Sequence, residues 1–185
     1  SSTEELNRAF DSLILSASGW RKVFAQSEDE EDAGTEIGLA NQVIVAHMAA
    51  SFAWYLNSKN TTGQVKTIVL GTDSRPTSRE IADIMSRVFI GAGFSVKYLF
   101  ISAAPEIMAY ARSFMGFAYV SASHNPIGHN GVKFGLNDGG VIPGSEAALV
   151  IDYFKKSCLS PDSIVQAQQL IFACSIDELK KVWSA

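Results

Sequence analysis

The sequence of 185 residues has few cysteines and no long uninterrupted apolar run. Cys158 and Cys174 are the only cysteines, and their spacing matches no zinc-binding or thioredoxin-like pattern, so we expect reduced core thiols in a cytoplasmic protein. The most apolar segment, residues 43–56, is interrupted by polar side chains and is shorter than the roughly 20 residues that a membrane span needs. Residues 1–5 are polar and acidic, unlike a signal peptide. These features predict a soluble protein with no membrane partner.

A concentration of positive charge is also missing. The formal net charge is -4, and the basic residues are scattered apart from pairs at 155–156 and 180–181. Nucleic acid would need a basic tract that neutralises its phosphates, so we expect no nucleic-acid partner. The consecutive acids at 28–32 predict a solvated loop, because contiguous carboxylates cannot all point towards one metal ion.

The composition, with 47% hydrophobic and 18% charged residues, is typical of a compact globular protein, and the length suits a single domain with a real core. Segments with strand and helix patterns alternate along the chain. Strands are expected near 13–15, 65–70, 94–101, 117–121 and 132–135, helices at 36–56, 77–91, 104–114, 145–156, 163–174 and 175–183, and a loop at 60–63. This order predicts a three-layer α/β/α domain whose mixed, mostly parallel sheet has one antiparallel strand and helices on both faces.

Three local signals refine this prediction. Thr77 and Glu80 have the spacing of a capping box at a helix start. The pair at 130–131, Asn-Gly, is typical of a hairpin turn and predicts that the last strand is antiparallel to its predecessor. His47 lies beside an apolar helical stripe and is expected to be a hydrogen-bonded core or boundary histidine.

The loop at 121–126, Ser-Ala-Ser-His-Asn-Pro, carries most of the reactive side chains, and Lys133 follows on the next strand. A serine hydrolase would need Gly-x-Ser-x-Gly and a serine paired with a histidine, but Ser123 and His124 are adjacent and diverge on extended backbone. Phosphoryl transfer fits better. Ser123 offers a nucleophilic oxygen, His124 and Asn125 offer donors, and Lys133 offers a charge or a proton.

Two further loops place an arginine after a predicted strand. Arg21 follows Ser-Gly-Trp, and Arg75 lies in Gly-Thr-Asp-Ser-Arg-Pro at 71–76. Ligands bind at strand ends in open α/β sheets. Backbone amides at a helix start attract phosphate, and the positive charge of Arg75 adds to that attraction. Each arginine also has a structural interpretation: a solvated side chain for Arg21, and a scaffold pair of Asp73 with Arg75.

These segments resemble the motifs of the α-D-phosphohexomutases, which include phosphoglucomutases, phosphomannomutases and phosphoglucosamine mutases. Ser-His-Asn-Pro at 123–126 with Asn-Gly-Val-Lys at 130–133 resembles the phosphoserine loop of that family. Ser-Gly-Trp-Arg at 18–21 resembles its Ser-Gly-x-Arg motif, and residues 71–78 resemble its Gly-x-Asp-x-Arg segment. The resemblance covers about residues 12–155 and corresponds to the first of four domains.

The resemblance implies that Ser123 is the phosphorylated residue. It would donate its phosphate to a phosphorylated hexose and be rephosphorylated from a sugar 1,6-bisphosphate, so that sugar 1-phosphate and 6-phosphate (glucose or mannose phosphate) interconvert. A phosphate oxygen on Ser123 would also be a ligand of Mg²⁺, which suits a group carrying about -1.5 to -2 charge.

The other matching residues receive roles from the same resemblance. Lys133 would be the general acid and base, and His124 a second proton relay or hydrogen-bonding group. Arg21 would help to neutralise the phosphoserine. Asn125 and Arg75 would bind phosphate or substrate, with Arg75 alternatively bracing the loop through a neighbouring aspartate.

The sequence also departs from the family pattern. Ser-Ala at 16–17 replaces a frequent Gly-Thr, and Lys22 stands where glycine is common, so the backbone around Arg21 is less determined by the motif. The Asp-x-Asp-x-Asp segment of domain two and the sugar and phosphate loops of domains three and four do not occur in these 185 residues. We therefore expect an N-terminal piece of a longer four-domain enzyme, inactive alone, with a helical extension at 156–185. The alternative is a phosphohexomutase-like binding or structural module without catalysis.

Overall fold

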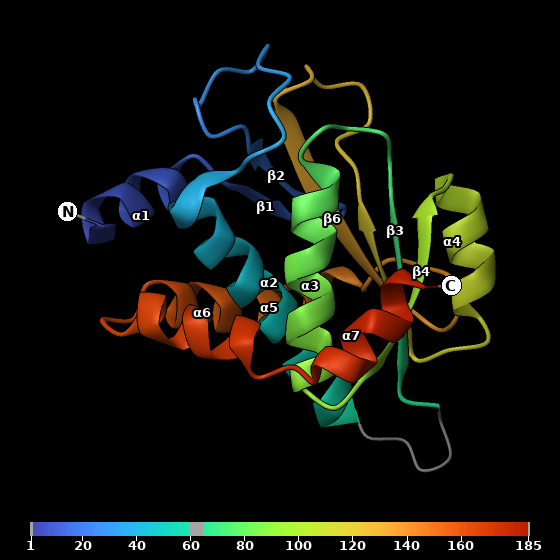
Figure 1. Cartoon of the computed structure of the whole chain (residues 1–185). Coiled ribbons are helices and arrows are strands. Elements are labelled where there is room, and N and C mark those ends of the chain that lie inside the picture. Colours follow the sequence, from blue (N-terminus) through green and yellow to red (C-terminus); the bar gives the residue numbers. More distant parts are fainter. Residues whose placement is uncertain (1, 60–64, 185) are drawn as a thin grey trace.

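The computed structural model describes residues 2–59 and 65–184, in which helices cover both faces of one six-stranded sheet (Figure 1). The helices are α1 (Ser2–Asp11), α2 (Gly38–Lys59), α3 (Ser78–Gly91), α4 (Ala104–Ala111), α5 (Gly144–Cys158), α6 (Ser163–Phe172) and α7 (Ile176–Trp183). The strands are β1 (Ile14–Ser16), β2 (Gly19–Val23), β3 (Thr67–Thr72), β4 (Ser95–Ile101), β5 (Gly116–Val120) and β6 (His129–Leu136). The predicted three-layer α/β/α fold with a mixed sheet is confirmed. The predicted loop at 60–63 lies outside the described residues.

The strand order is β1-β2-β6-β5-β3-β4. β3 pairs in parallel with β4 and β5, whereas the pairings of β5 with β6, β6 with β2 and β2 with β1 are antiparallel. Two strands, β6 and β1, therefore run against the other four, where one was expected. The difference arises because the predicted strand at 13–15 is the first arm of a hairpin, and its second arm, β2, carries Arg21 within the strand instead of after it.

The core lies mainly between the sheet and α2, α3 and α5, while α4 packs on the opposite face with a smaller apolar cluster. Trp20 explains why β2 joins the sheet, because its indole is buried against Phe134 and Phe154. α2 is buried on most of its sides, and Phe52 stacks on Phe134 at 4.5 Å between ring centroids. The contact between Trp20 and Phe134 thus holds β2, which carries Arg21, beside β6, which carries Lys133.

The prediction for His47 is confirmed. This residue is buried in α2, and its Nε2 lies 2.9 Å from the carbonyl oxygen and 3.0 Å from the hydroxyl of Ser163 at the start of α6. Burial lowers the pKa of the His47 imidazole, which favours its neutral form. α6 and α7 pack against the preceding fold, α6 on α2 and α3 and α7 on α3 and β4, where Trp183 contacts Tyr98 at 5.0 Å between ring centroids.

The capping box expected at the start of α3 does not form. Thr77 makes no capping hydrogen bond, and its hydroxyl instead accepts one from the side chain of Asn130 at 3.0 Å. The Glu80 carboxylate accepts hydrogen bonds from the backbone of Ile37 and the side chain of Gln42. Both side chains of the expected capping box therefore form hydrogen bonds with distant segments of the chain instead of with each other's backbone.

The Asn-Gly pair also has a different role from the one predicted. Asn130 and Gly131 lie inside β6, and a longer loop, residues 121–128, joins β5 to the expected antiparallel strand. A Cβ on Gly131 would lie 2.7 Å from the carbonyl oxygen of Trp20, so glycine is needed for the close approach of β2 to β6. α1 was not predicted.

The acidic segment at 28–32 is a largely exposed loop, as predicted. Glu28 pairs with Arg8 of α1 at 3.1 Å, and Glu30 lies 3.3 Å from Nε2 of His129. Across residues 2–59 and 65–184, none of the helices has both the length and the apolar character that crossing a bilayer requires.

Candidate functional site

A hollow of about 180 Å³ opens between β2, β6 and the loop at 121–128. Three predicted site residues line it: Arg21 from β2, Ser123 from the loop and Lys133 from β6. Small groups complete its wall, namely Ser18, Gly19, Ser121, Ala122 and Val132. The antiparallel pairing of β2 with β6 explains this convergence, because Arg21 lies opposite Gly131 in the ladder.

Ser123 has an unusual backbone conformation. Its φ of 55° lies in the left-handed region, which costs a residue with a Cβ about 1–2 kcal/mol. The side chain of Ser123 is exposed, and its backbone N–H donates to the hydroxyl of Ser121 at 3.1 Å. The tight turn thus places the exposed Ser123 at the hollow that Arg21 and Lys133 also line.

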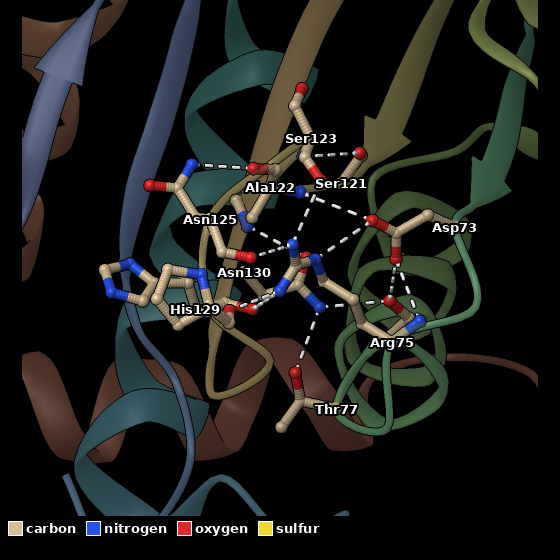
Figure 2. Close-up of polar contacts among 12 residues, drawn as sticks. Asp73, Arg75, Thr77, Ser121, Ala122, Ser123, Asn125, His129 and Asn130 are labelled. Atoms are coloured by element: carbon tan, nitrogen blue, oxygen red, sulfur yellow. Dashed lines mark hydrogen bonds and ion pairs between the residues drawn. The ribbon is translucent and has the colours of Figure 1, made fainter. Parts of the chain in front are cut away.

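Arg75 holds this loop in place, as Figure 2 shows. Its Nη1 donates to the carbonyl oxygens of Pro126 and His129, and its Nη2 donates to those of Ser123 and Asn125. The guanidinium is largely buried, so these charge-assisted bonds are shielded from competing water. Arg75 therefore fixes the loop through its backbone.

Asp73 also holds the loop, through Arg75 and through the backbone of Ala122. Its Oδ2 lies 3.2 Å from Nε of Arg75 and 3.4 Å from the backbone nitrogen of Ala122, while its Oδ1 accepts from the hydroxyl of Ser78 at 3.0 Å. This arrangement corresponds to the scaffold interpretation of the Asp73–Arg75 pair. Arg75 is not among the residues that line the hollow, and its binding of phosphate stays a prediction.

His124 and Asn125 are not brought into the hollow. His124 is exposed on the loop. The Asn125 side chain donates to the carbonyl oxygen of Ala122 at 2.6 Å and borders a second cavity on the other side of Arg21. The catalytic role of His124 and the substrate-binding role of Asn125 stay predictions.

Sequence reasoning missed two buried polar residues that support the site. Asn130, fully buried, donates to the hydroxyls of Thr77 and Ser78, both at 3.0 Å, and so ties β6 to the start of α3. Its partners lie more than 50 residues away, so no local pattern indicates them.

Lys22 is the second. It is 4% exposed, and its ammonium donates to Oδ1 of Asn41 at 2.5 Å and lies over the Phe24 ring. Burial lowers the pKa of Lys22 to about 8, against the opposing effect of the Glu28 carboxylate. The one signal in the sequence is the lysine itself, at a position where the family pattern commonly has glycine.

The residues of the hollow do not by themselves suit a magnesium ion. Mg²⁺ prefers an octahedron of oxygen ligands, and the side chains lining the hollow include no carboxylate. In the part of the chain that the structure describes, no group of three or more His, Cys, Asp and Glu side chains is placed to hold a metal ion. Ser123 can contribute one oxygen.

Comparison with known proteins agrees with this architecture. Residues 13–159 match the family model described as phosphoglucomutase/phosphomannomutase, alpha/beta/alpha domain I. A phosphoglucosamine mutase from Trichormus variabilis is 41% identical over 81 residues, which are 42% of this chain and 16% of that protein. One from Nostoc punctiforme is 40% identical over 89 residues, which are 46% of this chain and 18% of that protein. The chain thus spans less than a fifth of the length of these relatives.

A solved structure shares the fold. A crystal structure described as a phosphomannomutase from Thermus thermophilus superposes with a TM-score of 0.61 and 25% sequence identity, covering 77% of this chain and 30% of that one. The family match includes both strands of the hollow and the loop that bears Ser123. The chain therefore belongs to the phosphoglucomutase/phosphomannomutase family, and residues 13–159 are its alpha/beta/alpha domain I.

Proposed function

We propose that this chain is the phosphoserine-bearing domain of a phosphohexomutase, which interconverts sugar 1-phosphate and sugar 6-phosphate through a sugar 1,6-bisphosphate. The observation that carries the proposal is the convergence of Ser123, Lys133 and Arg21 on one hollow of a family domain. The hydroxyl is a phosphate carrier, the amine exchanges a proton with the sugar hydroxyl, and the guanidinium spreads the negative charge of the phosphate.

In the forward step, a hydroxyl of the sugar phosphate attacks the phosphorus of phosphorylated Ser123. The new bond joins the sugar oxygen to phosphorus, the bond from phosphorus to Oγ of Ser123 breaks, and Lys133 takes the hydroxyl proton. The same steps in reverse, from the other phosphate of the bisphosphate, restore phosphoserine and leave the isomeric monophosphate. Phosphoryl transfer depends on positioning and charge stabilisation more than on covalent chemistry. The reaction therefore needs the fixed position that Arg75 gives to the loop bearing Ser123.

The substrate is a phosphorylated hexose. Glucose and mannose phosphates were expected from the sequence, and the relatives named phosphoglucosamine mutase add an amino sugar phosphate to the candidates. The remaining partners are further domains of the same polypeptide, which would supply the other ligands of Mg²⁺ and the contacts that select the sugar. The two free cysteines support a cytoplasmic location.

The proposal is tested by the mass of the protein. Incubation of the full-length protein with glucose 1,6-bisphosphate is expected to add about 80 daltons, the mass of one phosphate, at Ser123. The Ser123→Ala variant is expected to show no such addition. The 185 residues alone are expected to show no turnover of glucose, mannose or glucosamine phosphates. If the full-length protein never carries phosphate at Ser123 and its mutase activity survives Ser123→Ala, the chain is a binding or structural module instead.

A further inference from the structure

A second cavity lies beside the hollow and is not used by the proposed reaction. It measures about 340 Å³ and opens between α1, β2 and the end of the loop at 125–129. We call it the basic pocket and define it by Arg8, Arg21, Lys22, Glu28, Asn125 and His129. Its volume falls at the lower end of the range for small-molecule sites, about 300–1,000 Å³.

The charge of the basic pocket is opposite to that of the whole chain. The chain has a formal net charge of -4, yet the pocket brings together Arg8, Arg21 and Lys22 against the single carboxylate of Glu28. His129 faces the acidic loop, where Glu30 lies 3.3 Å from its Nε2. Positive charge gathered in a concave site raises the local concentration of anions.

Two of these cations are available to a ligand. Arg21 is exposed, and its guanidinium makes no hydrogen bond or ion pair with another residue within 2–59 and 65–184. Arg8 pairs with Glu28 at 3.1 Å, but the two side chains are 70% and 56% exposed, and such pairs contribute little to stability. An anion with two or more charges can therefore replace Glu28 as the partner of Arg8.

Arg21 lines both the basic pocket and the hollow at Ser123. A guanidinium that turns towards an anion in the basic pocket is removed from the phosphate that Ser123 would carry. A rotation of the Arg21 side chain alone would therefore couple the two cavities.

We propose that the basic pocket binds a small multivalent oxyanion, of the size of inorganic pyrophosphate, and that this anion inhibits phosphate transfer at Ser123 by competing for Arg21. The inhibitory part rests on the proposed function, whereas the binding part does not. Arg8 and Arg21 supply the accessible charges, and Asn125 adds a polar wall.

The binding part is tested by calorimetric titration of the unphosphorylated protein with inorganic pyrophosphate at low ionic strength. Arg8→Gln is expected to weaken binding about tenfold, because it removes one charge-assisted contact. Glu28→Gln is expected to tighten binding, because it frees Arg8 and removes the pocket's own carboxylate. Arg87→Gln, which alters a half-buried arginine of α3 paired with Asp83, is the matched control and is expected to leave the affinity unchanged.

The regulatory part is tested by following the transfer of phosphate from glucose 1,6-bisphosphate to Ser123 by intact mass. Pyrophosphate is expected to slow the transfer with a midpoint that matches its binding constant, and Glu28→Gln is expected to lower that midpoint. If Ser123 never takes phosphate, the proposed function fails while the binding result stands. Absence of saturable binding, or equal losses in Arg8→Gln and Arg87→Gln, overturns the basic pocket as an anion site.

Discussion

Nη2 of Arg75 donates a hydrogen bond of 3.1 Å to the backbone carbonyl oxygen of Ser123, 48 residues further along the chain. The side chain that shapes the loop bearing Ser123 therefore comes from the connection between β3 and α3. The conformation of Ser123 depends on this distant contact as much as on the sequence around it.

Arg75→Met is expected to lower the free energy of unfolding by about 3 kcal/mol, because it leaves four backbone carbonyls and the Asp73 carboxylate without their partner. Urea unfolding measures this loss. Hydrogen exchange is expected to rise at residues 121–129 before the rest of the sheet. Arg87→Met, which breaks a half-buried i,i+4 pair with Asp83 at 3.0 Å, should cost less than about 1 kcal/mol, and equal costs would contradict the role of Arg75 in holding the loop.

Two substitutions of Ser123 distinguish the steric cost of its backbone conformation from the role of its hydroxyl. Both Ser123→Ala and Ser123→Gly are expected to abolish acceptance of phosphate, because neither has a hydroxyl. Ser123→Gly is expected to be more stable than Ser123→Ala by about 1 kcal/mol, since glycine adopts a φ of 55° without a steric cost. Thermal unfolding of the two variants measures the difference, and the opposite order would show that the loop is not strained.

Lys22 makes stability depend on pH. Its pKa is about 8 in the folded protein and 10.5 as the ordinary value, so between these pH values the unfolded chain binds more protons. The free energy of unfolding is therefore expected to rise with pH across this window, by up to about 3 kcal/mol relative to Lys22→Met. Chemical denaturation of both proteins from pH 7 to 10 tests the slope, and parallel curves would refute a buried, partly discharged amine.

Gly131→Ala tests the close approach of β2 and β6. The added methyl would meet the carbonyl oxygen of Trp20 at 2.7 Å, so the strands must separate, at an expected cost of more than about 2 kcal/mol. Gly144→Ala is the control, since no atom lies within 4 Å of the Cβ it would add at the start of α5. Similar stabilities of the two variants would show that the ladder tolerates a side chain at 131.

The order of strands and helices was predictable because strongly apolar segments, such as those that form α2 and β3, alternate with polar loops along the chain. The family motifs likewise predicted that Ser123, Lys133 and Arg21 share a site, and the structure places them around one hollow. The assignments that failed depend on contacts between distant segments. Glu80 binds Ile37 and Gln42 instead of capping its own helix, and the hairpin of β1 and β2 required the packing of Trp20.

His47 and Ser163 meet across 116 residues of sequence, beyond the end of the family match at residue 159. A protein shortened to that boundary would lose the oxygen atoms that satisfy a buried imidazole, together with the helix that covers it. The shortened chain would then expose a polar group in an apolar surface on α2 and would be prone to self-association. Expression of this domain should therefore retain α6, although the family boundary omits it.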